Sequence, residues 1–298
     1  MAVTNILGED NSLEKTKVVT QGTIIWENFK RHKVAVGASV LFIIMAVACF
    51  AAPVVAPYKF DAINLSAIRQ APTIEHIMGT DDLGRDLFTR ILYGGRISIL
   101  IGILSAIVGT FLGALVGALA GFYGGNVDNI LMRLTDIAYS IPTLPLLIVL
   151  SSFSNSAVSI MILIIGFLSW MPTARVVRGS VLSVKEKEYV EAARMIGAPD
   201  WVIILQHVLP NIAGPIIVGA TLGVGEAIIV ESSLSFLGLG VQPPTPTWGN
   251  MLMDSQATMS SKPWLTIFPG MAILFIVLAV NFIGDGLHDA LDPTLRRR

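Results

Sequence analysis

The stretch KEKEYVEAARMIGAPDWVIILQHVLP, residues 185–210, decides how this chain folds. It is rich in charged side chains, although long apolar runs lie on both sides of it. Its first half predicts a short helix that ends at Gly197, because glycine permits a left-handed turn, with Pro199 following. Asp200 is expected to cap a second short helix, which Pro210 would end. A charged helix–turn–helix loop between apolar runs indicates a docking surface.

The composition indicates a membrane protein. Of the 298 residues, 53% are hydrophobic and 14% are charged, with a mean hydropathy of +0.71. Soluble proteins carry about a quarter charged residues, so most of this surface must face lipid or other membrane subunits. The net charge of −1 gives no reason to expect a nucleic-acid partner. The single cysteine, Cys49, lies in an apolar run and is expected to be a buried, unreactive thiol.

Six apolar segments are long enough to cross a bilayer, which takes about 20 helical residues. They cover residues 34–56, 97–121, 130–153, 157–174, 212–238 and 265–284. We therefore predict an all-α integral membrane protein with six transmembrane helices and a helical loop over 175–211. The first run exceeds the apolar part of a cleaved signal, about 7–15 residues, so we expect it to remain as an anchor.

The distribution of Lys and Arg predicts the orientation. With both termini on the same side, that side carries 14 of the 20 basic residues, so both termini and the 175–211 loop are expected in the cytoplasm. The predicted organisation is a tail with an interfacial helix (1–33), an anchor (34–56), an external loop (57–96), a five-helix core (97–284) and a C-terminal tail (285–298). The apolar side chains of residues 21–33 suit a helix at the membrane surface, and a plain positively charged flank is the alternative.

A stripe of small residues follows the second predicted span. Gly109, Gly113, Gly117 and Gly121 recur every four residues, so they share one face of the helix. Such a stripe lets two helix backbones approach closely, and van der Waals packing then supplies the association energy. We expect this helix to pack tightly against another.

Several residues within the spans are candidates for lining a pathway. Pro142 and Pro145 each remove a backbone donor and are expected to kink the third span. Asp136, Glu226 and Glu231 are costly in a bilayer and usually face a bundle interior or an aqueous cavity. The alternatives are a structural kink for the prolines, and for the carboxylates a pairing with a partner subunit or a position near the interface.

We expect this chain to have no catalytic activity of its own. Its four histidines show no metal-ligand spacing, and it has no Gly-x-x-x-x-Gly-Lys-Ser/Thr phosphate loop. We predict a non-catalytic subunit that binds neither metal nor cofactor, so any use of ATP must come from a partner. Within the charged loop, Tyr189, Ala192, Ala193 and Ile196 are predicted to share a face that enters a partner's groove. An amphipathic loop resting on lipid is the alternative.

Four separated motifs resemble the permeases of ABC importers. Glu191-Ala192-Ala193, Gly197 and Leu209-Pro210 resemble their EAA loop, and the sequence His207-Val208-Leu209-Pro210-Asn211 is similar to the peptide/nickel branch. Three further stretches resemble the C-type permease of that branch, the dipeptide/oligopeptide permease family: GTDDLGRD at 79–86, FLGLGVQPP at 236–244, and GDGL at 284–287 with Leu291-Asp292-Pro293.

This resemblance implies an importer of di- or oligopeptides in a prokaryotic plasma (inner) membrane. It implies a homologous second permease, an extracytoplasmic solute-binding protein and two ATPase subunits that bind ATP and Mg. The 175–211 loop would carry the coupling helix, with Tyr189, Glu191, Ala192, Ala193, Ile196, Gly197, Leu209 and Pro210 as the coupling residues. Nickel, glutathione or another small solute is the alternative cargo, and an ion-gradient transporter, a channel or a structural scaffold is the alternative class.

Overall fold

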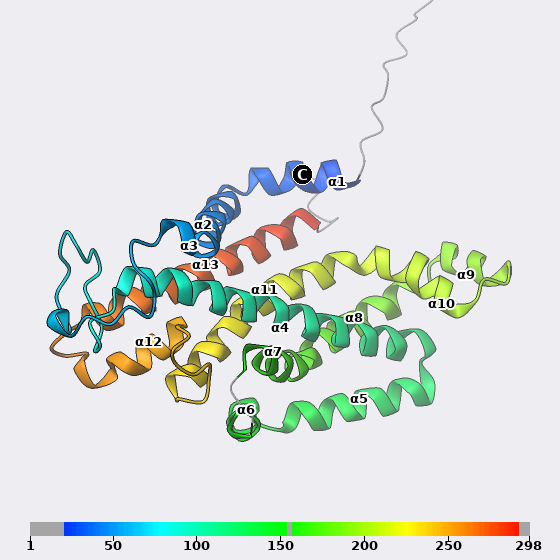
Figure 1. The fold of residues 1–298 in the computed structure, drawn as a ribbon. Helices are drawn as coiled ribbons and strands as arrows, with labels where there is room; N and C mark the ends of the chain where they lie inside the picture. The colour runs from blue at the N-terminus through cyan, green and yellow to red at the C-terminus, as the bar shows by residue number, and fades with distance from the viewer. Residues whose placement is uncertain (1–20, 154–156, 292–298) are drawn as a thin grey trace, which may run out of the picture.

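Figure 1 shows the computed structural model, which describes residues 21–153 and 157–291. Within those ranges every regular element is a helix. The elements are α1 (Gln21–Arg31), α2 (Lys33–Phe50), α3 (Ala52–Val55), η1 (Leu65–Ala67), α4 (Leu87–Tyr123), α5 (Gly125–Ser140), α6 (Thr143–Ser152), α7 (Val158–Phe167), α8 (Trp170–Val184), α9 (Glu188–Met195), α10 (Asp200–Val202), η2 (Ile203–Val208), η3 (Leu209–Ile212), α11 (Ala213–Phe236), α12 (Trp248–Ser255), η4 (Gln256–Thr258) and α13 (Trp264–Leu291).

The prediction of an all-α membrane protein is confirmed. Four helical segments are long and apolar enough to cross a membrane, and the number rises to six if each of two bent helix pairs forms one span. The charged loop with α9 and the segment with α12 lie at opposite ends of the bundle (Figure 1). Of the predicted tails, residues 1–20 and 292–298 lie outside the described residues, and they include the Asp292-Pro293 part of the last motif.

α4 is the longest helix and begins earlier than predicted. Asp86 caps it, because a side-chain oxygen accepts a hydrogen bond of 2.8 Å from the backbone N–H of Thr89. Residues 87–96, predicted as external loop, are therefore its first turns. At 1.5 Å per residue, its 37 residues extend about 55 Å, well beyond the apolar thickness of a bilayer.

The glycine stripe of α4 lies against α8. A β-carbon at Gly113 would stand 2.6 Å from the Trp170 carbonyl oxygen and 2.6 Å from Cβ of Thr173. At Gly121 it would stand 2.8 Å from Cβ of Val181. Gly109 and Gly117 face Ser169 and Ala174 of the same segment in the same way. The two backbones are thus so close that no side chain fits between them.

Two of the predicted spans are sharply bent. α5 and α6 meet at 80° where Pro142 follows Ile141, and α7 and α8 meet at 43°. The expected kink at Pro145 is wrong, since this residue lies in the first turn of α6, where its missing N–H would have no helical partner anyway.

The first and last helices of the described residues pack together. Ile25, Phe29 and Ala35 of α1 and α2 contact Leu287 and Ala290 of α13. Residues 285–291 therefore continue α13 rather than starting a tail. At the other end of the first predicted span, α2 ends at Phe50 and the short α3 follows.

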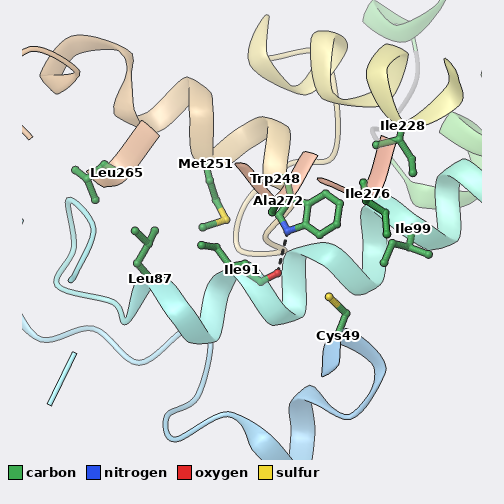
Figure 2. Close-up of a cluster of buried hydrophobic side chains, with 10 residues drawn as sticks. All are labelled: Cys49, Leu87, Ile91, Ile99, Ile228, Trp248, Met251, Leu265, Ala272 and Ile276. Atoms are coloured by element: carbon green, nitrogen blue, oxygen red, sulfur yellow. Dashed lines mark hydrogen bonds between the residues drawn. The ribbon is translucent and has the colours of Figure 1, made fainter. Parts of the chain in front are cut away.

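An apolar core holds α12 to the bundle (Figure 2). Trp248 is fully buried, and its ring N–H donates a 3.0 Å hydrogen bond to the Ile91 carbonyl of α4. Cys49 of α2 is buried in the same cluster, near the position where Gly95 leaves room for both residues. At its N-terminus, α12 is fixed by reciprocal side-chain-to-backbone hydrogen bonds between Thr247 and Asn250.

Gly113→Ala should lower the thermal stability of the purified chain, because the added methyl group meets backbone and Cβ atoms that cannot rotate away. Overpacking of this kind costs about 1–3 kcal/mol. Gly37→Ala in α2 is the matched control, since a β-carbon there meets no atom within 4 Å. Equal melting temperatures for the two variants would contradict the close approach of α4 and α8.

Candidate functional site

The charged loop places α9 at one end of the bundle (Figure 1). Glu188 and Glu191 lie in its first turn and Arg194 in its last, which complements the helix dipole. Lys185, just before α9, donates a 2.9 Å hydrogen bond to the Gly121 carbonyl of α4. The loop is therefore tied to the end of α4.

The inner face of α9 is anchored in a buried cluster. Val190 and Ala193 are buried and, being three residues apart, share one face of the helix. The cluster is completed by buried apolar side chains of α4, α8 and the segment after α9: Ala118, Phe122, Val177, Val181, Ile203, Ile204, Val208 and Ile212. The prediction that Ala193 shares the outward face is therefore wrong.

The outer face of this loop is apolar and exposed. Met195 is 82% exposed, Ile196 84% and Trp201 63%, and Tyr189 and Ala192 are exposed beside them. We call these five residues the docking patch. Glu191 is exposed on the same helix. Apolar side chains gathered in this way mark a contact site for another molecule.

Gly197 ends α9 as the sequence predicted. Its φ is +81°, the left-handed conformation in which glycine is favoured. The N–H of Ala198 bonds to the Ala193 carbonyl, and the N–H of Gly197 bonds to the Arg194 carbonyl. This is the Schellman pattern, so it satisfies the last carbonyls of the helix and turns the chain toward Asp200.

The helix after this turn continues into α11 as one candidate membrane span. Pro199, not Asp200, occupies the N-cap position, and Asp200 is the first residue of α10. The chain then passes through the π-helical η2 and the 3-10 helix η3 into α11, so the predicted stop at Pro210 is wrong. Pro210 is tolerated because it lies at the start of η3, where its missing N–H leaves no required hydrogen bond unmade. Leu209 packs on the buried cluster, and Pro210 is exposed.

Ion pairs join α5 to α8. Arg178 contacts Asp128 with a 2.6 Å hydrogen bond, and Arg175 contacts Asp136 at 2.8 Å. Arg175 also lies over the ring of Tyr139, 4.5 Å from its centroid. Asp136 thus has a cationic partner within the chain. The four charged groups border an open pocket of about 380 Å³ between the two helices.

Glu226 lies in a different and larger pocket. We call this the Glu226 pocket: a cavity of about 550 Å³ lined by side chains of α5 through α8, α11 and α13. Its polar members are Tyr139, Thr143, Ser169, Ser233 and Asn281, and the rest of the lining is apolar apart from Glu226 itself. The bend at Pro142 brings Thr143 and Leu144 to this pocket, although neither Pro142 nor Pro145 lines it.

Glu231 is fully buried away from both pockets. Its carboxylate accepts hydrogen bonds from Ser235 at 2.7 Å and from Ser98 of α4 at 3.0 Å. The Ser98 hydroxyl also accepts a 3.4 Å hydrogen bond from the backbone N–H of Trp248. Glu231 therefore links α11, α4 and α12. The structure separates the three carboxylates that the sequence grouped as pathway candidates.

The GTDDLGRD motif forms a network of buried charges at the α12 end. Arg85 donates to Asp81 at 2.6 Å, and Arg90 approaches the same carboxylate at 3.3 Å. Asp254 of α12 lies 4.0 Å from Arg90. Burial raises the pKa of Asp254, while Arg90 and Arg85 oppose that rise. The motif holds the loop before α4 in place and attaches it to α12.

Sequence reasoning missed the polar residues that accompany Glu226. Ser233 lies seven residues after Glu226, which places both on one face of α11, and that spacing was available as a signal. Ser169 and Asn281 come from other helices, so only the packing of the chain reveals them. Among the described residues, no group of three or more His, Cys, Asp or Glu side chains is placed to hold a metal ion.

A bundle of membrane helices with a docking patch at one end and a polar pocket between its spans defines a transport permease. Residues 109–297 match the family described as the binding-protein-dependent transport system inner membrane component, and residues 20–72 match the N-terminal TM domain of oligopeptide transport permease C. The chain belongs to the binding-protein-dependent permease family, and it is a multi-span helical membrane protein of that inner-membrane class.

Two curated relatives are similar over nearly the whole chain. The oligopeptide transport system permease protein OppC of Escherichia coli (strain K12) is 41% identical over 95% of both chains. The glutathione transport system permease protein GsiD of Escherichia coli O6:K15:H31 (strain 536 / UPEC) is 40% identical over 91% of this chain and 90% of the relative.

A solved structure shares the fold. A chain of the MetNI methionine ABC transporter, in inward facing conformations, is 17% identical with a TM-score of 0.56. The similarity covers 67% of this chain and 94% of that one.

Glu231→Ala should destabilise the chain, because it leaves the hydroxyls of Ser98 and Ser235 without their acceptor and opens a cavity. Loss of a buried hydrogen-bonding partner costs about 1–3 kcal/mol before the cavity is counted. Glu231→Gln keeps an acceptor oxygen and should melt closer to the wild type. The measurement is thermal unfolding of the purified chain in detergent, and an unchanged melting temperature for Glu231→Ala would contradict the linking role.

Proposed function

We propose that this chain is one of two homologous permease subunits of an ATP-driven importer for di- or oligopeptides. Its α9 end and both termini face the cytoplasm of a prokaryotic cell, and two ATPase subunits dock on the patch. Those subunits bind ATP and Mg, and this chain supplies no catalytic residue. A solute-binding protein delivers the peptide at the α12 end.

The observation that carries the proposal is the docking patch on an anchored helix. The side chains of Met195 and Ile196 are free to enter a groove, while Val190 on the opposite face holds α9 to the bundle. Tyr189, Ala192 and Glu191 complete the outer surface of the coupling element. Four further residues support this surface. Ala193 and Leu209 pack on the buried cluster, Gly197 makes the turn, and Pro210 lies where the helix continues toward α11.

The same anchoring supports a route from the patch to the pathway. The buried cluster under α9 includes Val177 and Val181 of α8, and Ile203 and Val208 at the start of the helix that becomes α11. Both helices reach the Glu226 pocket, α8 through Pro172 and α11 through Glu226 itself. Movement of an ATPase groove would therefore move two walls of the pocket together. ATP and loaded binding protein drive transport only if they favour one arrangement of these helices over the other.

Glutathione is the second candidate cargo, because the permease GsiD is almost as similar to the chain as OppC. Reconstituted complexes of this chain with its second permease, ATPases and binding protein decide between the two. We expect ATP-dependent uptake of labelled trialanine. Uptake of glutathione alone would support the second candidate, and uptake driven by an ion gradient without ATP would contradict both.

Ile196→Ser should weaken the retention of ATPase subunits during purification of the complex, because it removes an exposed apolar anchor from the docking patch. Anchors at interfaces contribute about 1–4 kcal/mol, so retention should fall at least several-fold. Ile74→Ser is the control, since Ile74 is 99% exposed in the loop before α4, at the opposite end. If Ile196→Ser retains the ATPases as well as the control does, the patch is not their docking site.

The orientation is tested by labelling single cysteines on a Cys49→Ala background. A membrane-impermeant thiol reagent added outside intact cells should label Ile74→Cys and spare Ile196→Cys. Inverted vesicles from cells that lack the ATPase subunits, in which the docking patch is uncovered, should give the opposite result. Labelling of position 196 from outside would reverse the proposed topology.

A further inference from the structure

Glu226 is a carboxylate with open space in front of it and no partner in the described part of the chain. Its side chain is exposed at the middle of α11, and no hydrogen bond or ion pair joins it to residues 21–153 or 157–291. It differs in this from Asp136, which contacts Arg175, and from Glu231, which is enclosed by serine hydroxyls.

The Glu226 carboxylate lies among uncharged side chains. Among the residues that the structure describes, no Lys, Arg or His lines the Glu226 pocket, and Tyr139 is the one other titratable side chain there. A second pocket of about 210 Å³, bordered by Ala106 and Thr110 of α4, shares Glu226, Ser169 and Pro172 with the first. Glu226 therefore stands where two adjoining cavities meet, and each wall contributes apolar or neutral polar groups.

An unpaired carboxylate within a candidate membrane span can attract a cation from outside the chain. Charged side chains within membrane segments face a bundle interior or an aqueous cavity rather than lipid. The volume of the Glu226 pocket falls in the range of small-molecule sites, about 300–1,000 Å³. A passing ligand with a positive group at one end and a neutral segment next to it matches both the space and the charge.

We propose that Glu226 is a transient subsite for the protonated amino terminus of the peptide during its passage. The inference deepens the proposed function and rests on it. The carboxylate holds the ammonium group. Asn281 of α13 can donate to or accept from the first peptide units, and the Ser233 hydroxyl, which donates to the Ile229 carbonyl, can accept from them. The subsite binds the amino group by charge rather than by shape, because the rest of the lining is uncharged and most of it is apolar.

The test compares wild-type and Glu226→Gln complexes at different pH values with one probe, trialanine. An α-amino group has a pKa of about 7.7–8.0, so the probe is protonated at about pH 6.5 and largely neutral at about pH 9. With saturating loaded binding protein, the wild type should import roughly tenfold faster than Glu226→Gln at the lower pH, the ratio expected of a modest charge-assisted contact. The ratio should fall toward one at the higher pH. Dividing the two rates cancels the pH response of the binding protein and the ATPases.

Three control variants keep the result specific. Asp285→Asn makes the same chemical change on α13 outside the pocket and should give a ratio near one at both pH values. Glu226→Asp keeps the charge and should retain the pH-dependent advantage over Glu226→Gln. Tyr139→Phe should leave the pH dependence in place, because the proposed contact is with the Glu226 carboxylate and not with the phenol.

Three outcomes overturn the inference. A ratio of one at both pH values means that Glu226 does not meet the substrate. If Glu226→Gln imports more slowly than the wild type by the same factor at both pH values, and less of the two-permease complex is recovered, then Glu226 pairs with a cation of the second permease. Both leave the proposed function intact, whereas a wild-type complex that imports no peptide removes the proposed function and this subsite together.

Discussion

The close approach of α4 and α8 is the constraint on which the rest of the structure depends. In a membrane, two helices gain little from burying apolar side chains, since the surrounding lipid is equally apolar. Their association energy comes from contact between backbones, and the glycines of α4 permit that contact along four turns. Once α8 is fixed in this way, the end of α8 fixes the starting point of the loop that carries α9.

The small surface helix α9 is held so firmly that it can act on the Glu226 pocket inside the bundle. α9 is only eight residues long, and a helix of this length has little stability by itself. It is held by Val190, by the Schellman turn at Gly197 and by the bond from Lys185 to α4. A partner that pushes on the outer face therefore moves α8 and the helix leading to α11 rather than bending α9 alone.

The sequence predicted the features that depend on local rules. The helical loop, its end at Gly197 and the membrane spans follow from charge, glycine and long apolar runs. The errors arose where tertiary packing overrides local preference. Pro210 does not end a helix because π and 3-10 turns carry the backbone past it. Ala193 faces inward because it lies on the helix face that Val190 buries in the apolar cluster. Asp136, Glu226 and Glu231 look alike in the sequence, and their different surroundings come from residues far along the chain.

The π-helical segment Ile203–Val208 sets the rotational phase between the loop and α11. Its backbone hydrogen bonds span five residues instead of four, so it holds one residue more than an α-helix of the same number of turns. Each α-helical residue turns the chain by about 100°, so winding the same six residues as α-helix would rotate all of α11 by roughly that angle. Glu226 would then leave its pocket and face a neighbouring helix or lipid. The winding of a six-residue segment outside the pocket thus decides which face of α11 lines the pocket.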